Sequence, residues 1–344
     1  MHKPKQPLSA SRIKLAQSCS WLYYSRYFLN LPDAGNDGSS RGTIVHEVFE
    51  LLGDPKEKIN YDKIVKSQDP FSVKKIKNLI LKLAKELKVD DEQNLELIKE
   101  MILNGLSYDF YGEKHGKPTE AISEKDFEIV VAEENKSYKI KGFIDKLFLY
   151  KKKKYALIRD FKSSKQKFKG KEITDNLQDY MYSLAVKHLY PEYKNRQSEF
   201  LFLKFELDED IGEQSNGVIK MNPISEDDLE GFEYYLTELQ EYLDNFDESD
   251  ARSNFAANQD YPSDKSFGGP LMCGFAKERG QLKLDGTPMW HCPARHPFDY
   301  YVILNDKGEI VKSYEEDKFK SSFVEEGFTF EKRSYKGCPR YYNW

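Results

Sequence analysis

Two apolar segments joined by four consecutive lysines constrain the fold of this chain most strongly. Residues 139–150 and 155–162 each have the composition of a β-strand, and the short connection between them predicts a hairpin. Asp145 lies in the first strand, and Asp160 and Lys162 lie at the end of the second. Because residues two apart in a strand point to the same face, Asp160 and Lys162 are expected side by side. Two acids and a lysine on neighbouring strands are the groups that a metal-dependent phosphodiester-cleaving site requires.

Burial of the first strand on both sides would make its acid, Asp145, energetically unfavourable. Phe143 and Leu147 share one face of residues 139–150, and Ile144 lies on the other, so the strand is expected to be buried on both sides. An acid inside such a strand costs on the order of several kcal/mol unless it is paired or bound to a metal. Asp145 therefore indicates a charged partner or a metal ion.

The bulk composition limits the class of protein. The chain has 344 residues, enough for a large core and more than one structural unit. Its 53 basic and 58 acidic residues give a net charge of −5, so a nucleic-acid partner would have to bind a local basic patch. No apolar run is long enough to span a bilayer, and the N-terminus lacks the apolar stretch of a secretory signal. These features predict a cytoplasmic location and no membrane partner, and they are compatible with a cellular or a viral source.

Periodicity predicts an α/β fold, with helices and strands in separate segments along the chain. Helices are expected at 9–30, 42–52, 74–88, 92–110, 174–189 and 226–246. Strands are expected at 127–131, 139–150, 155–162 and 200–207. Pro32, Gly35 and Gly38 predict a loop over residues 31–40. The region 268–344 is expected to be irregular apart from one hairpin, at 300–303 and 310–314.

Four short motifs follow one another along the chain. They are Gly42–His46, Gly142–Asp145, Asp160–Ser163 and Gln178–Tyr182. Each has an ordinary explanation when taken alone; a histidine on an apolar helix, for example, is more often a core residue than a ligand. Their order resembles G-x-x-x-H, G-x-(I/V)-D, D-x-K-(T/S) and Q-x-x-x-Y of the RecB-like branch of the PD-(D/E)XK nucleases, which includes CRISPR-associated exonucleases. The resemblance covers residues 9–190, and Ser163 stands where the family often has threonine.

The resemblance implies a restriction-endonuclease-like core, in which helices flank a mixed central sheet, with a helical insertion and an irregular C-terminal extension. The N-terminal helices of the core would occupy residues 1–55, and the helical insertion would occupy 56–122. The sheet and remaining helices of the core would span 123–246. The cysteine-containing extension would then be 247–344.

The same resemblance implies a set of metal ligands. Asp145 and Asp160 would be carboxylate ligands of Mg²⁺ or Mn²⁺. His46 would add an imidazole, which suits Mn²⁺ better than Mg²⁺. The backbone carbonyl of Phe161 would be a further ligand.

The resemblance also implies catalytic roles for three more residues. Lys162 would position or deprotonate the attacking water and offset charge in the transition state. Gln178 and Tyr182 would orient this lysine and the DNA backbone, and they are four residues apart on one helical face. Further lysines at 165, 167, 169 and 171 follow the strand; they are either a solvated loop or contacts to DNA phosphates.

The four cysteines allow several interpretations. Cys19 precedes the nuclease motifs, and three follow them: Cys273, Cys292 and Cys338. Some RecB-like nucleases carry a [4Fe–4S] cluster on one cysteine before the core and three after it, although there the last three are close together. Four separate buried thiols, or a zinc site formed by the last three cysteines with His291 or His296, are the alternatives.

The sequence thus predicts a metal-dependent deoxyribonuclease, acting as an exonuclease on single-stranded DNA or DNA ends in repair or recombination. A structure-specific or restriction-like endonuclease is one alternative. Another is a DNA-binding subunit of a repair or recombination complex with little activity. The chain has no G-x-x-x-x-G-K-(S/T) motif, so a built-in helicase motor is not expected.

Overall fold

The computed structural model of the protein describes residues 4–33, 35–212, 214–253 and 292–342. The chain separates into two compact units. The first comprises Met1–Ala10 and Gly35–Glu241, and the second comprises Ser11–Ala34 and Tyr242–Trp344. All four nuclease-like motifs lie in the first unit. The four-part division expected from the sequence stays a prediction.

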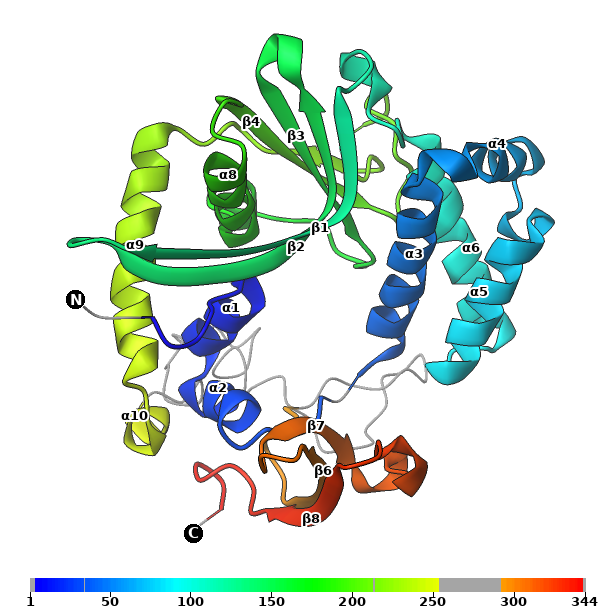
Figure 1. Cartoon of the computed structure of the whole chain (residues 1–344). Coiled ribbons are helices and arrows are strands. Elements are labelled where there is room, and N and C mark those ends of the chain that lie inside the picture. The colour runs from blue at the N-terminus through cyan, green and yellow to red at the C-terminus, as the bar shows by residue number, and fades with distance from the viewer. Residues whose placement is uncertain (1–3, 34, 213, 254–291, 343–344) are drawn as a thin grey trace. The chain divides into compact units, whose positions relative to one another are not determined.

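A five-stranded mixed sheet forms the centre of the first unit (Figure 1). Its strands, in spatial order, are β1 (Glu120–Ala132), β2 (Ser137–Tyr150), β3 (Tyr155–Lys162), β4 (Asn195–Phe202) and β5 (Val218–Lys220). The β3–β4 pair is parallel, and the other neighbouring pairs are antiparallel. This mixed sheet with flanking helices confirms the predicted fold class.

The hairpin between β2 and β3 confirms the first sequence prediction. Lys146 of β2 pairs with Arg159 of β3, and the ladder continues to the turn at Tyr150 and Tyr155. β1 is longer than the predicted strand, and it begins at Glu120. The fold thus places Asp145, just beyond the β2–β3 ladder, beside the end of β3.

Helices cover the sheet and build the main core of this unit. They are α3 (Asp37–Gly53), α4 (Lys58–Ser67), α5 (Lys74–Glu86) and α6 (Glu92–Ser107), shown at the right of Figure 1. Apolar residues at helical spacing explain their packing: Val45, Val48 and Leu52 of α3 are fully buried in one cluster with Phe161 and Leu201 of the sheet. α3 is therefore held directly against the strands that carry the motifs.

The start of α3 differs from the sequence prediction. Residues 31–40 were expected to form a loop, but α3 begins at Asp37. The side chain of Asn36 accepts a hydrogen bond from the backbone N–H of Ser39 at 3.0 Å, which caps the helix. An N-cap can thus start a helix in a glycine-containing segment.

The parallel β3–β4 pair requires a crossover, and helices supply it. These are α7 (Lys171–Thr174) and α8 (Leu177–Leu189), which occupy most of the predicted helix 174–189. α8 packs on β3 and β4. Asn176 caps α8 by accepting hydrogen bonds from the N–H groups of Gln178 and Asp179. The last helix that begins in this unit is α9 (Glu226–Asp244).

The second unit contains α1 (Ala10–Ser18, from its second residue), α2 (Ser20–Tyr27), α10 (Glu248–Ser253) and a three-stranded antiparallel sheet. The predicted helix 9–30 is divided because Cys19 has an extended backbone, with φ −162° and ψ 115°. The predicted hairpin is present as β6 (Phe298–Leu304) and β7 (Ile310–Glu315), and β8 (Thr329–Tyr335) pairs with β6. No helix within the described residues has the length and apolar character needed to cross a membrane.

Candidate functional site

α3 delivers His46 to the sheet because a glycine permits close packing. A Cβ atom added to Gly42 would lie 2.8 Å from the Oγ of Ser163, at the end of β3. A larger residue would force the Ser163 side chain or the first turns of α3 to shift. Since His46 is four residues further on, its side chain projects from the same face of the helix as Gly42.

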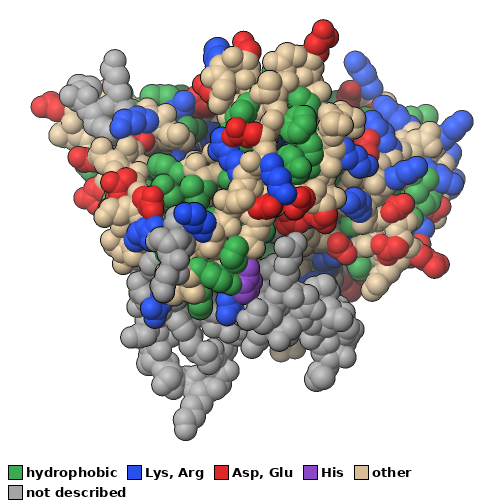
Figure 2. All heavy atoms as spheres, turned by 90° about the horizontal axis from the view of Figure 1, so that it is seen from below, with side chains coloured by type: hydrophobic (Ala, Val, Ile, Leu, Met, Phe, Trp, Pro, Cys, Tyr) green, Lys and Arg blue, Asp and Glu red, His purple; other side chains and the backbone are tan. Residues whose placement is uncertain are grey.

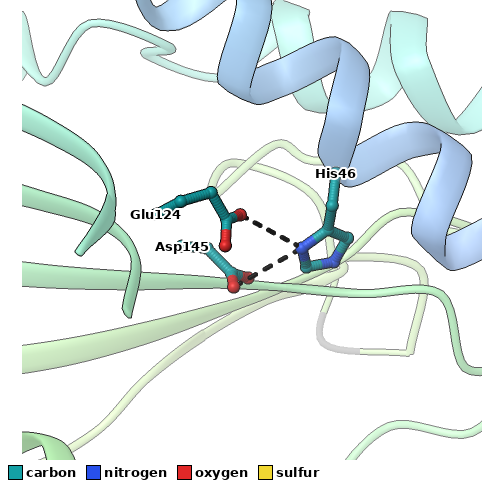
Figure 3. A group of neighbouring side chains, drawn as sticks. All are labelled: His46, Glu124 and Asp145. Carbon is teal, nitrogen blue, oxygen red and sulfur yellow. Dashed lines mark ion pairs between the residues drawn. The ribbon is translucent and has the colours of Figure 1, made fainter. Parts of the chain in front are cut away.

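His46, Glu124 and Asp145 converge from α3, β1 and β2, as Figure 3 shows. Their potential ligand atoms all lie within 4.8 Å of one another. Nδ1 of His46 is 3.4 Å from Oδ1 of Asp145 and 3.7 Å from Oε1 of Glu124. Nε2 of the same ring is 3.2 Å from the carbonyl oxygen of Phe161. An imidazole, two carboxylates and a carbonyl are a donor set that fits Mn²⁺ or Mg²⁺.

The carboxylates of this group are difficult to keep ionised together, as the pKa values of Asp145 and His46 show. Burial, and then the neighbouring charge of Asp160, raise the pKa of Asp145 to about 6, against the lowering effect of His46. Burial alone would lower the pKa of His46, but hydrogen bonds to Asp145 and Glu124 outweigh it and raise this pKa to about 10. Both ring nitrogens of His46 face oxygen acceptors. In the absence of a metal, the protonated imidazole is thus the cation that balances the acids.

A second network surrounds Asp160, which is 3% exposed. Its Oδ1 accepts hydrogen bonds from Nε2 of Gln178 at 2.8 Å and from the hydroxyl of Tyr182 at 3.0 Å. Its Oδ2 lies 2.5 Å from Nζ of Lys162. The ammonium of Lys162 also donates to Oε1 of Gln178 at 2.8 Å. The amide of Gln178 therefore holds the lysine and the aspartate in fixed positions.

The two networks meet at Phe161. Its backbone N–H donates to Oδ2 of Asp145 at 2.7 Å, and its carbonyl faces His46. Asp160 does not belong to the group that converges within 4.8 Å, although its charge acts on both Asp145 and His46. The structure thus brings all the predicted metal and catalytic residues into one region. Their individual roles stay predictions.

Glu124 is the residue that the sequence prediction missed. It stands opposite Asp145 in the β1–β2 register, between the pairs Ser123–Lys146 and Lys125–Ile144. Its backbone φ is +47°, in the left-handed region that a glutamate rarely adopts. Such strained positions concentrate at functional sites. No local sequence pattern marks this conformation; only its place on the strand paired with β2 could have pointed to it.

We call His46, Glu124 and Asp145 the metal-compatible group. A pocket of about 400 Å³ opens beside two of its members, His46 and Glu124. It is lined by Ser39, Gly42, Thr43, His46, Glu47, Glu50, Glu124 and Ser163. Burial raises the pKa of Glu50, and the charges of Glu124 and Glu47 raise it further. A divalent cation at the pocket floor would relieve this crowding of acids.

The described cysteines lie in the second unit. Cys19, Cys292 and Cys338 form no disulfides. Cys338 and Cys292 are electrostatic neighbours of the Tyr335 hydroxyl, whose pKa is raised chiefly by burial. Nε1 of Trp21, two residues after Cys19, donates to the same hydroxyl at 2.8 Å.

The remaining predicted ligands do not complete a cysteine site. Cys273 and His291 lie outside the described residues. Nδ1 of His296 lies 2.7 Å from the hydroxyl of Tyr342. Within the described ranges, the metal-compatible group contains no cysteine. The cluster and zinc predictions therefore stay predictions.

Comparison with known families decides the identity of the fold. A model of the PD-(D/E)XK nuclease superfamily matches residues 7–264, which is most of the chain. The chain belongs to the PD-(D/E)XK nuclease superfamily. Membership implies a nuclease that acts on DNA, and nucleases of this superfamily typically use divalent metal ions.

Two further comparisons add little to this assignment. A solved structure titled "Crystal structure of SSO0001" is 18% identical to this PD-(D/E)XK protein, with a TM-score of 0.24. The match covers 49% of this chain and 70% of that one. No curated protein matches the chain.

Proposed function

We propose that this PD-(D/E)XK protein is a RecB-like, metal-dependent exonuclease that hydrolyses phosphodiester bonds in single-stranded DNA or at DNA ends. The observation that carries the proposal is the convergence of His46, Glu124 and Asp145 beside the Asp160–Lys162 pair. The preference for ends rests on the resemblance of the four motifs to RecB-like exonucleases. The same resemblance suggests a role in repair or recombination, with other proteins of those processes as partners.

The residues present can hold Mg²⁺ or Mn²⁺. His46, Asp145 and Glu124 would bind the ion, with the carbonyl of Phe161 and a carboxylate oxygen of Asp160 close to them. When bound, the ion would polarise the phosphate and lower the pKa of a water molecule. The imidazole favours Mn²⁺ over Mg²⁺, because nitrogen ligands suit transition metals better.

The chain's own residues then supply orientation and charge. Lys162 would hold the attacking water and offset negative charge as the phosphate reaches its transition state. Gln178 fixes the ammonium of Lys162 against the carboxylate of Asp160, so the lysine loses little freedom during the reaction. Tyr182 would hold the carboxylate of Asp160 in position by donating to Oδ1.

A [4Fe–4S] cluster on Cys19, Cys273, Cys292 and Cys338 is a separate part of the proposal, with zinc as the alternative. It is supported by the one-before, three-after order of the cysteines. Iron, sulfide and zinc analysis of anaerobically purified protein tests it. A protein without iron would rule out the cluster, and one without either metal would leave ordinary thiols.

The main proposal is tested with end-labelled single-stranded DNA in Mg²⁺, Mn²⁺ or EDTA. We expect cleavage with either ion, none in EDTA, and none for Asp160→Ala, which should still bind DNA. Asp126→Ala is a matched control, because this acid lies two residues beyond Glu124 in β1 and its side chain is 79% exposed. Circular single-stranded DNA should resist the enzyme; cutting of circles would identify an endonuclease. Metal-dependent cleavage retained by Asp160→Ala would remove the assignment.

A further inference from the structure

Three cationic side chains lie beside the candidate active site, and none of them belongs to the four motifs. Arg41 lies in α3, one residue before the glycine that packs on Ser163. Lys165 follows β3, and Lys204 follows β4. The ends of parallel strands are where α/β proteins bind ligands.

The fold brings together the segments that carry these three residues. The backbone N–H of Leu203 donates to the carbonyl of Lys162 at 2.9 Å, which places Lys204 next to the end of β3. Asn104 of α6 donates to the carbonyl of Leu203 at 2.9 Å and fixes this turn. Ser163 donates to the carbonyl of Gly38 at 3.4 Å, which ties β3 to the start of α3.

The cluster is short of negative charge. No carboxylate within the described residues lies within 4.0 Å of the charged groups of Arg41, Lys165 or Lys204. Burial lowers the pKa of Lys204, and the charges of Arg41 and Lys165 lower it further, against a weaker opposite effect of Glu100. Bringing like charges together in this way costs free energy that a bound anion would recover.

Arg41 is the least solvated member. It is only 8% exposed, and one of its terminal nitrogens donates to the Oδ1 of Asn94. Its Nε is buried without a hydrogen-bond partner in the described part of the chain. A structural arginine holding α3 to α6 needs only the bond to Asn94. A buried guanidinium with a donor still unused, beside two lysines, fits an anion better.

We propose that Arg41, Lys165 and Lys204 form a phosphate-binding subsite that holds a DNA phosphate next to the one being cleaved. The inference rests on the proposed function, because a metal ion held by His46, Glu124 and Asp145 would bind the neighbouring phosphate, which is the one that is cleaved. Lys167 is not part of the subsite, since its ammonium donates to the carbonyls of Gln214 and Asn216. On the face seen in Figure 2, basic and acidic side chains are intermixed. A local cluster must therefore supply the attraction that a net charge of −5 cannot.

The test measures binding without cleavage, so that it does not depend on the chemistry of the metal site. Fluorescence anisotropy in EDTA would follow a labelled single-stranded oligonucleotide over a range of salt concentrations. Lys204→Gln should weaken binding about five- to tenfold and reduce the slope of log K against log salt by about 0.7, the value for one phosphate contact on single strands. Lys99→Gln is the matched control, because Lys99 is also partly buried, lies on α6 and is already paired with Glu96. It should leave both quantities unchanged.

Methylphosphonate substitution locates the phosphate. One neutral linkage should weaken binding of the wild type but have no further effect on Lys204→Gln. If the subsite instead holds a terminal phosphate, the wild type should bind oligonucleotides with phosphorylated ends more tightly than those with hydroxyl ends. Lys204→Gln should abolish this difference in affinity. Arg41→Lys, checked for its melting temperature, should show the same pattern more weakly.

The outcomes separate the two proposals. If the wild type does not bind single-stranded DNA, the proposed substrate is wrong. If it binds and Lys204→Gln matches the wild type in affinity, salt slope and methylphosphonate sensitivity, the phosphate subsite is wrong while the nuclease proposal stands.

Discussion

The affinity of the site for a metal should depend steeply on pH, because a proton on His46 competes with the ion. A metal ligand must be deprotonated, and the pKa of His46 is about 10 in the metal-free protein. At pH 7 this competition is about three pKa units, or about 4 kcal/mol of metal-binding free energy. Raising the pH removes the competing proton, so binding tightens about tenfold per unit between roughly pH 6 and 10. Below about pH 6, protonation of Asp145 should steepen the dependence.

Calorimetric titration with Mn²⁺ measures this effect in two ways. From pH 7.0 to 8.5 the affinity of the wild type should rise about 30-fold. At pH 7.5, titrations in buffers with different ionisation enthalpies should report about one proton released per ion. His46→Gln keeps a neutral polar side chain but cannot titrate, so it should show weaker binding without this dependence. A flat affinity and no proton release in the wild type would refute His46 as a metal ligand.

Three further predictions follow from buried polar groups. Gln178→Leu breaks the link between Lys162 and Asp160 and should lower the cleavage rate about 10- to 100-fold, measured at saturating DNA, with little change in DNA affinity; an unchanged rate would show that the link is dispensable. Burial raises the pKa of Asp179 to about 6, so its charged form destabilises the fold fully above that pH and not below about 3.9. Asp179→Asn should therefore stabilise the protein by about 3 kcal/mol at pH 8 and by less than about 1 kcal/mol at pH 4, as thermal melting would show. Burial, and then the charge of Arg159, lower the pKa of Lys146 to about 7. The charged lysine therefore destabilises the fold most below pH 7 and not above about 10.4. Lys146→Met should raise the melting temperature more at pH 6 than at pH 9.5, and equal gains at the two pH values would contradict this pKa assignment.

The sequence predicted the parts of the site that lie on well-marked elements. The strands around Asp145 and Asp160 are apolar runs with a short lysine turn, so their pairing follows from local composition. Gln178 and Tyr182 are one helical turn apart, and in the structure they do reach the same carboxylate. Periodicity was sufficient to predict that two residues act together wherever both lie on the same helix or strand.

The parts that the sequence could not predict depend on distant contacts. Glu124 lies in the polar, partly exposed start of β1, where no alternation marks a strand, and its pairing is imposed by β2. The start of α3 at Asp37 depends on a cap and on packing that outweigh the nearby glycines. Strand β8 joins its sheet through pairing with β6, about 30 residues earlier in the chain. Each of these features is set by tertiary structure rather than by local propensity.

The most direct test of the central claim is a crystal structure of the protein grown with Mn²⁺, with the ion located by its anomalous scattering. The proposed site predicts one strong peak in the first unit, about 2.1 Å from ligand atoms of His46 and Asp145, with Glu124 and the carbonyl of Phe161 around it. If such crystals show no manganese at this position while the His46 imidazole still bridges the two carboxylates, these residues do not form the metal site.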